Sequence, residues 1–169
     1  MPADISGVEA TKPGGADVSF TLPTVSDPIS NGVHSDINTK VNICTPAPNA
    51  TFALGSTTVS CLATDNAGNV SSTSVFTVTV VDTTPPNIPQ HSSMTKEAAD
   101  KFGAAVTYSV NAADLVDGNF AASCLPASGS TFAIGTTKVS CDATDKHGNV
   151  ATTMTFNITV QDTVPPVIT

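Results

Sequence analysis

Hydrophobic and polar residues alternate along several stretches of the chain. Apolar residues stand at every second position of 59–63 and of 76–80, and weaker alternation covers 18–22 and 106–110. Successive side chains on a strand point to opposite faces, so each stretch predicts a β-strand with one buried face. No stretch combines helical spacing of apolar residues with capping residues at its ends. The pattern therefore predicts an all-β fold.

A turn sequence separates two of the predicted strands. DNAGN at 65–69 occurs again as DKHGN at 145–149. Its Asp can accept backbone hydrogen bonds, and Gly68 or Gly148 can adopt a positive φ. The flanking strands are therefore expected to pair antiparallel. Turn residues recur often enough for about seven short strands per domain, which is typical of an immunoglobulin-like β-sandwich.

The chain contains the same sequence twice. Residues 44–82 align with 124–162 at a period of 80 without a gap, and 22 of the 39 positions are identical. This predicts two tandem immunoglobulin-like β-sandwiches, at 1–82 and 83–162, joined by a short proline-containing linker. Residues 163–169 repeat the linker sequence, so they resemble the start of a further repeat or a donor strand.

The predicted core consists of the apolar residues that share one face of these strands. In the first domain they are Phe20, Val41, Ile43, Phe52, Leu54, Val59, Phe76, Val78 and Val80. Their counterparts in the second are Tyr108, Phe132, Ile134, Val139, Phe156, Ile158 and Val160. Phe102 and Phe120 lie outside the repeated strands, so they are either further core residues or exposed anchors for a ligand.

Charge limits the partners of the chain. It carries 6 Lys and Arg against 14 Asp and Glu, a formal net charge of −8. Nucleic-acid binding relies on clustered basic residues, and six dispersed ones form no such cluster. Hydrophobic residues make up 40%, too many for a disordered acidic tail, yet no apolar run reaches the roughly 20 residues that span a bilayer. We expect a folded chain that neither binds nucleic acid nor inserts directly into a membrane.

Four cysteines form two pairs with identical spacing, Cys44 with Cys61 and Cys124 with Cys141. Zinc sites usually place two ligands two to four residues apart, and neither pair does. One disulfide within each repeat is therefore expected. Disulfides persist in oxidising environments, so the expected location is extracellular or at a cell surface.

Each repeat carries the same ordered motif. It runs from Cys-x-Pro through Phe-x-x-Gly and Val-x-Cys-x-Ala-x-Asp-x-x-Gly-Asn to a closing Phe and Asp in the last strand. This motif resembles the hyaline repeat, or HYR, domain over nearly the whole chain. The resemblance implies an immunoglobulin-like module of extracellular or cell-surface proteins, often in tandem, associated with adhesion and without catalysis. Many animal members have a second cysteine pair, which both copies lack.

Acidic residues occupy segments that this topology would bring to one end of the second domain. Asp145 and Asn149 lie in the last turn, Asp114 and Asp117 in an earlier loop, and Asp82 in the linker. Calcium takes six to eight oxygen ligands, so these five residues are candidate ligands for an ion that would stiffen the joint. The alternative is that each Asp caps its own turn and the linker Asp adds solubility. No other cofactor is expected.

A catalytic site is not expected. A nucleophile needs a base within reach, and the three histidines, His34, His91 and His147, occupy no equivalent positions in the two repeats. The sequence also has no phosphate-binding glycine loop and no histidine pair at metal spacing.

The C-terminal segment is a candidate assembly element. Val167, Ile168 and Thr169 would add a strand to the first domain of another copy, giving a head-to-tail homopolymer by β-augmentation. The alternative is that the segment leads into neighbouring repeats of a longer array.

Three asparagines begin Asn-x-Ser/Thr triplets and are candidate glycosylation sites: Asn49, Asn69 and Asn157. Asn157 alternates with apolar neighbours, so it should face solvent, whereas the side chain of Asn69 has a competing role in its turn. Such triplets also arise by chance in a chain rich in Ser and Thr.

Two functions fit these observations. The first is a non-catalytic structural role, as a spacer or filament subunit of a cell-surface assembly. The alternative is an adhesion module that recognises carbohydrate or protein through loop residues. With no Trp and one Tyr, the chain offers few aromatic anchors, which favours the structural role.

Overall fold

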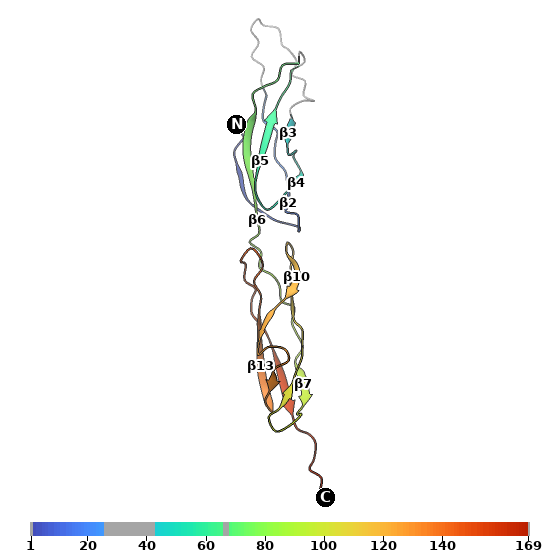
Figure 1. Cartoon of the computed structure of the whole chain (residues 1–169). Coiled ribbons are helices and arrows are strands. Elements are labelled where there is room, and N and C mark those ends of the chain that lie inside the picture. The colour runs from blue at the N-terminus through green and yellow to red at the C-terminus, as the bar shows by residue number, and fades with distance from the viewer. Residues whose placement is uncertain (1, 26–42, 66–67, 169) are drawn as a thin grey trace. The chain divides into compact units, whose positions relative to one another are not determined.

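The structure, a computed structural model, describes residues 2–25, 43–65 and 68–168. These residues form 14 strands and no helix, as the alternation predicted. None of the described segments is therefore a helix able to cross a membrane. The chain divides into two compact units, Met1–Asp82 and Thr83–Thr169, and Figure 1 labels some of their strands.

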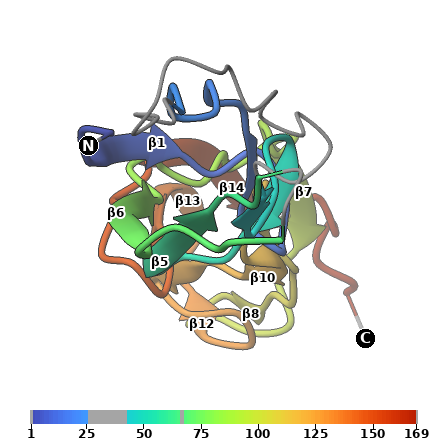
Figure 2. The ribbon, with the colours of Figure 1, turned by 90° about the horizontal axis from the view of Figure 1, so that it is seen from above.

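The first unit contains strands β1 to β6. Their bounds are β1 Ile5–Glu9, β2 Ala16–Val18, β3 Ile43–Thr45, β4 Ala50–Phe52, β5 Gly55–Leu62 and β6 Ser74–Val81. One sheet has the order β1-β6-β5-β3, and β2 pairs with β4. β1 runs parallel to β6, whereas β5 is antiparallel to both of its neighbours. Figure 2 shows β1, β6 and β5 side by side.

The second unit contains strands β7 to β14. Their bounds are β7 Met94–Glu97, β8 Ala104–Ala105, β9 Asn111–Asp114, β10 Gly118–Ala121, β11 Ser123–Leu125, β12 Thr131–Phe132, β13 Gly135–Asp142 and β14 Met154–Gln161. The larger sheet has the order β11-β13-β14-β7, with β9–β10 and β8–β12 as separate pairs. β7 takes the place of β1, parallel to the last strand, and β11 takes the place of β3. The larger sheets of the two units therefore have the same strand order.

The predicted antiparallel neighbours on either side of the repeated turn are confirmed. Val59 in β5 lies opposite Phe76 in β6, and Val139 in β13 lies opposite Phe156 in β14. The parallel pairing of the first strand with the last was not predicted. It joins segments at opposite ends of each unit, and the first strand carries no clear alternation.

Most of the predicted core is buried. Phe52, Val59, Phe76, Val78, Val80, Phe132, Val139, Phe156, Ile158 and Val160 are each at most 4% exposed. Phe20, Leu54 and Tyr108 are partly buried. The prediction is wrong for Ile43 and Ile134, which are 48% and 50% exposed. In β3 Cys44 points inward, so alternation turns Ile43 to solvent, and Ile134 lies in the corner that follows the buried Phe132. Val41 lies outside the described residues.

One aromatic pair recurs in the two cores. Phe20 meets Phe76 edge to face with 5.1 Å between ring centroids, and Tyr108 meets Phe156 in the same way at 5.2 Å. Phe120 packs against the core of the second unit. The recurrence extends the structural equivalence of the units from the backbone to the packing of side chains.

A glycine in each unit sits against a neighbouring backbone. Gly15 has a φ of +113°, and a Cβ on it would lie 1.9 Å from the carbonyl oxygen of Phe52. Gly103 has a φ of +121°, and a Cβ there would lie 1.8 Å from the carbonyl oxygen of Phe132. Both the conformation and the close approach therefore require glycine at these positions.

Candidate functional site

Each unit contains its predicted disulfide. Cys44 is bonded to Cys61 and Cys124 to Cys141, each pair 17 residues apart in the chain. The two Cα atoms of each bond are only 4.0 and 4.1 Å apart, because the cysteines face each other directly across β3–β5 and β11–β13. Each disulfide therefore links an edge strand to its neighbour within one sheet.

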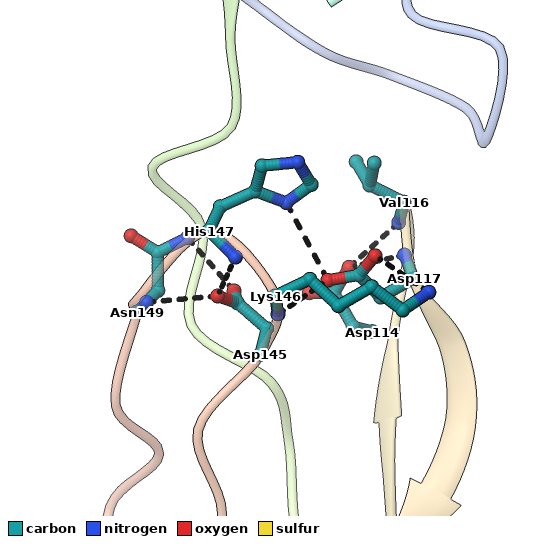
Figure 3. A network of polar contacts seen from close by, with 7 residues as sticks. All are labelled: Asp114, Val116, Asp117, Asp145, Lys146, His147 and Asn149. Carbon is teal, nitrogen blue, oxygen red and sulfur yellow. Dashed lines mark hydrogen bonds and ion pairs between the residues drawn. The ribbon is translucent and has the colours of Figure 1, made fainter.

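A network of polar contacts lies in the second unit, where the β9–β10 hairpin meets the loop between β13 and β14 (Figure 3). We call it the loop cluster. Its residues are Asp114, Val116, Asp117, Asp145, Lys146, His147 and Asn149.

Asp145 closes its own loop. Its Oδ1 accepts the backbone N–H groups of His147 and Asn149, and its Oδ2 accepts the side-chain amide of Asn149, all at 2.8 Å. The residue is 8% exposed. Burial alone would raise the pKa of this carboxyl, but the hydrogen bonds to Asn149 and to the loop backbone outweigh it and hold the pKa below its ordinary value. The loop is therefore stabilised by the ionised form.

Asp117 joins the hairpin to the loop. Its Oδ2 accepts the backbone N–H of Lys146 at 2.8 Å and lies 3.4 Å from Nδ1 of His147, while its Oδ1 lies 3.3 Å from Nζ of Lys146. The Lys146 backbone N–H is the main cause that lowers the pKa of Asp117. Burial opposes it, and the charges of Lys146 and His147 add to the lowering. This carboxylate holds two segments together that are distant in the sequence.

Asp114 shapes the hairpin and keeps one oxygen without a partner. Its Oδ1 accepts the backbone N–H groups of Val116 and Asp117 at 2.7 and 2.8 Å. Its Oδ2 is buried and accepts no hydrogen bond. An open pocket of about 340 Å³ borders the cluster, lined by Asp117, Asn119, Phe120, Thr144, Asp145 and Lys146.

Four of the five predicted calcium ligands lie in the loop cluster: Asp114, Asp117, Asp145 and Asn149. The fifth, Asp82, is a buried residue at the end of the first unit. Asp114 and Asp145 each accept backbone N–H groups of their own turn, which supports the alternative of turn capping. The partnerless Oδ2 of Asp114 is the oxygen that favours a cation. Calcium binding stays a prediction.

The candidate glycosylation sites are all exposed: Asn49, Asn69 and Asn157. Asn157 faces solvent from β14, as its alternation predicted. The side-chain amide of Asn69 donates to Oδ2 of Asp65 at 2.8 Å, so this residue has the expected competing role. Glycosylation itself stays a prediction.

The candidate assembly residues extend from the end of the second unit. Val167 is 84% and Ile168 is 100% exposed. Thr169 lies outside the described residues.

The sequence did not reveal the side chains that attach the first strand of each unit to the last. Oδ1 of Asp4 accepts the backbone N–H of Thr77 at 2.7 Å, and Oγ of Ser93 accepts the backbone N–H of Asn157 at 3.2 Å. The two contacts are structurally equivalent, but an Asp in one unit and a Ser in the other leave no repeated residue to notice.

Comparison with known proteins follows the boundaries of these units. The family model of the HYR domain matches residues 5–80 and 81–160. The chain belongs to the HYR domain family. It is also similar to two proteins named Hyalin, with 33% identity over 161 residues to that of Strongylocentrotus purpuratus and 31% over 162 residues to that of Lytechinus variegatus. The alignments cover 90% and 92% of this chain but only 13% and 29% of those relatives.

Family membership and the two disulfides together indicate an extracellular, adhesion-related module. Each HYR unit here has its own core, disulfide and sheet. The family does not by itself specify what role such a module has in its assembly.

Proposed function

We propose that this HYR chain is a non-catalytic structural module, a spacer or filament subunit of an extracellular or cell-surface assembly. The support comes from the segment that precedes β7. Asn87 of this segment exchanges two backbone hydrogen bonds of 2.8 Å with Ala113 of β9, and Ile88 is only 8% exposed in the core. Asn87 and Ile88 therefore attach this segment to the second HYR unit.

A second copy of that segment follows the second unit. TVPPVI at 163–168 repeats TTPPNI at 83–88. Ile168 corresponds to the buried Ile88 but is fully exposed, at 100%. Exposed apolar residues in a segment whose counterpart is buried are suited to contact another chain or domain. The proposed contact is docking of 163–169 on a further HYR unit, in a second copy of the chain or in a neighbouring repeat.

Removal of the segment tests this proposal. We would compare the full chain, a chain that lacks residues 165–169, and Val164→Ser. The counterpart of Val164 in the docked copy is Thr84, which is exposed, so this position is not expected to contribute to docking. The full chain and V164S should form head-to-tail oligomers at high concentration by analytical ultracentrifugation and electron microscopy, and the truncated chain should stay monomeric. If the full chain is monomeric, fusing a further HYR unit after it should bury Ile168. Equal assembly of the truncated chain, or an Ile168 that stays exposed in the fusion, would contradict the proposal.

Adhesion through loop residues is a second candidate function. Phe102 is not a core residue: it is 67% exposed at the turn before β8, with Nζ of Lys101 5.0 Å from the ring centroid. An exposed aromatic ring can stack on a sugar or anchor a protein ligand. Binding of the chain to a glycan array and to matrix proteins, compared with Phe102→Ala, tests this role. A ligand that binds both proteins equally would not use this residue.

A further inference from the structure

The first and last strands of each HYR unit are parallel neighbours. β7 pairs with β14 through four register positions, from Met94 opposite Ile158 to Glu97 opposite Gln161. β1 is also parallel to β6, with three register positions from Ile5 opposite Val78 to Glu9 opposite Val81, and its register shifts between Ile5 and Val8. The first and last strands of each unit are therefore bonded directly to each other.

Equivalent contacts extend this pairing at its two ends. Before β1 and β7, side-chain oxygens of Asp4 and Ser93 accept backbone N–H groups of the last strand. After β1 and β7, the N–H of Ala10 donates to the Val81 carbonyl and the N–H of Ala98 to the Gln161 carbonyl, both at 2.8 Å. Hydrogen bonds therefore join the first and last segments of each unit beyond both ends of the short strands β1 and β7.

Glu97 adds a contact to the segment that leaves the second unit. Its Oε1 accepts the backbone N–H of Thr163 at 2.6 Å, and its Oε2 accepts the Thr163 hydroxyl at 2.9 Å. Hydrogen bonds to a charged acceptor are roughly twice as strong as neutral ones. The first strand therefore holds residues beyond the end of β14 as well.

The direction of the strands decides how tension acts on them. Because the two strands are parallel, the start of the first and the end of the last lie at opposite ends of the pair. Tension on the two ends of a unit pulls the strands past each other, so all hydrogen bonds between them are loaded together. If both ends were at the same side, the bonds would instead break one after another.

We propose that the β1–β6 and β7–β14 pairs are mechanical clamps, and that resistance to tension is a function of these units. The inference rests on the proposed structural role, because only a tethered chain carries load. In the second unit the Asn87–Ala113 bridge, a single pair of bonds, gives way before the β7–β14 clamp. The disulfides lie at the opposite edges of the sheets, so they limit extension only after a clamp has opened.

The direction of pulling tests the clamp on one unchanged fold. In single-molecule force spectroscopy, handles at the two termini load β7–β14 in shear. A handle on a noncanonical residue at the exposed position 101, after β7, combined with the C-terminus, opens the same pair from one end. The first geometry should require a several-fold higher force. Equal forces in the two geometries would overturn the proposal, whatever the folding stability.

A pair of variants tests the contribution of Glu97. Glu97→Ala removes both bonds to Thr163, while Asp142→Ala removes the bond that the Thr153 hydroxyl donates to Asp142 between β13 and β14. Each protein is measured at the same interval below its own melting temperature. Under terminal tension E97A should then unfold roughly tenfold faster than the parent chain, and D142A at the parent rate. An equal effect of both variants would remove Glu97 from the clamp.

In the force measurement, unfolding of a whole unit is recognised by the increase in chain extension that it produces. Reduction of a disulfide should lengthen the extension of that unit by about 60 Å, for 17 residues at about 3.5 Å each. This measurement is independent of assembly. A strong clamp in a chain that neither assembles nor buries Ile168 in the fusion would leave the clamp intact and refute the structural role. Filaments of a chain without directional strength would do the reverse.

Discussion

Gly15 and Gly103 show how strongly one position constrains the backbone of each HYR unit. Each directly precedes a strand, β2 or β8, at a φ that other residues rarely adopt and against the carbonyl of a buried Phe. Gly14 is the neighbour of Gly15 in the same turn, but a Cβ on it would meet no atom within 4 Å. Comparison of Gly14 with Gly15 therefore distinguishes the cost of a steric clash from the cost of any substitution in this turn.

Gly15→Ala should destabilise the first unit by about 2–4 kcal/mol, because its Cβ would collide with the Phe52 carbonyl and its φ would be strained. Gly14→Ala should change stability by less than about 1 kcal/mol. Differential scanning calorimetry of the full chain measures both. Similar melting of G14A and G15A would show that the backbone adapts to the side chain.

Asp145 should make the second unit sensitive to acid. Its folded pKa lies below the ordinary value of 3.8, so its contribution is complete above that pH and is lost as pH falls through the folded value. Asp145→Asn should lower the melting temperature at neutral pH, because an amide would face the amide of Asn149, and should flatten the decline below about pH 4. The exposed Asp162→Asn is the charge-matched control. An unchanged acid profile in D145N would contradict this assignment.

The strands that the sequence predicted correctly are those long enough to show a period, whereas the weaker alternation at 18–22 and 106–110 forms no strand beyond Val18. β5, β6, β13 and β14 each have eight residues. Their alternation identified the buried face, and the repeated turn between them identified the antiparallel pairing. β8 and β12 have two residues each, too few for any period. The parallel strands β1 and β7 depend on contacts with the other end of the unit, which local sequence does not encode.

The sequence predicted the local contacts of the loop cluster but not its tertiary contacts. The repeated turn identified Asp145 and Asn149, because their hydrogen bonds are local. The contact of Asp117 with the Lys146 backbone is a tertiary contact, and its donor is an N–H that every residue except proline has. Residue type therefore gave no signal for it.

The disulfide of the second unit should act as an independent stabiliser of one sheet edge. Replacing both Cys124 and Cys141 by Ser should lower the stability of that unit by about 3 kcal/mol, the value expected for a loop of this length. Calorimetry should show the first unit melting as before, which serves as the internal control. Loss of both transitions together would mean that the units do not fold separately.

At the scale of the whole molecule, calcium would add stability that neither core supplies. Addition of calcium to protein treated with chelator should raise the melting temperature. At a free calcium concentration 100 times the dissociation constant, binding would add about 2.7 kcal/mol to the free energy of unfolding. Asp114→Asn keeps an oxygen for the turn but replaces the partnerless Oδ2, so it should abolish the shift. Magnesium and D162N are controls. A melting temperature that chelator and calcium leave unchanged would exclude this site.

The short span of each disulfide has a consequence for biosynthesis. A polypeptide that leaves an exporter from its N-terminus presents Cys44 and Cys61 well before Cys124. Closing a loop of 17 residues is entropically cheaper than joining cysteines of different units. The first pair can therefore oxidise before the second pair emerges. Additional repeats would each bring a local partner, so oxidative maturation would not become more error-prone as the polypeptide lengthens.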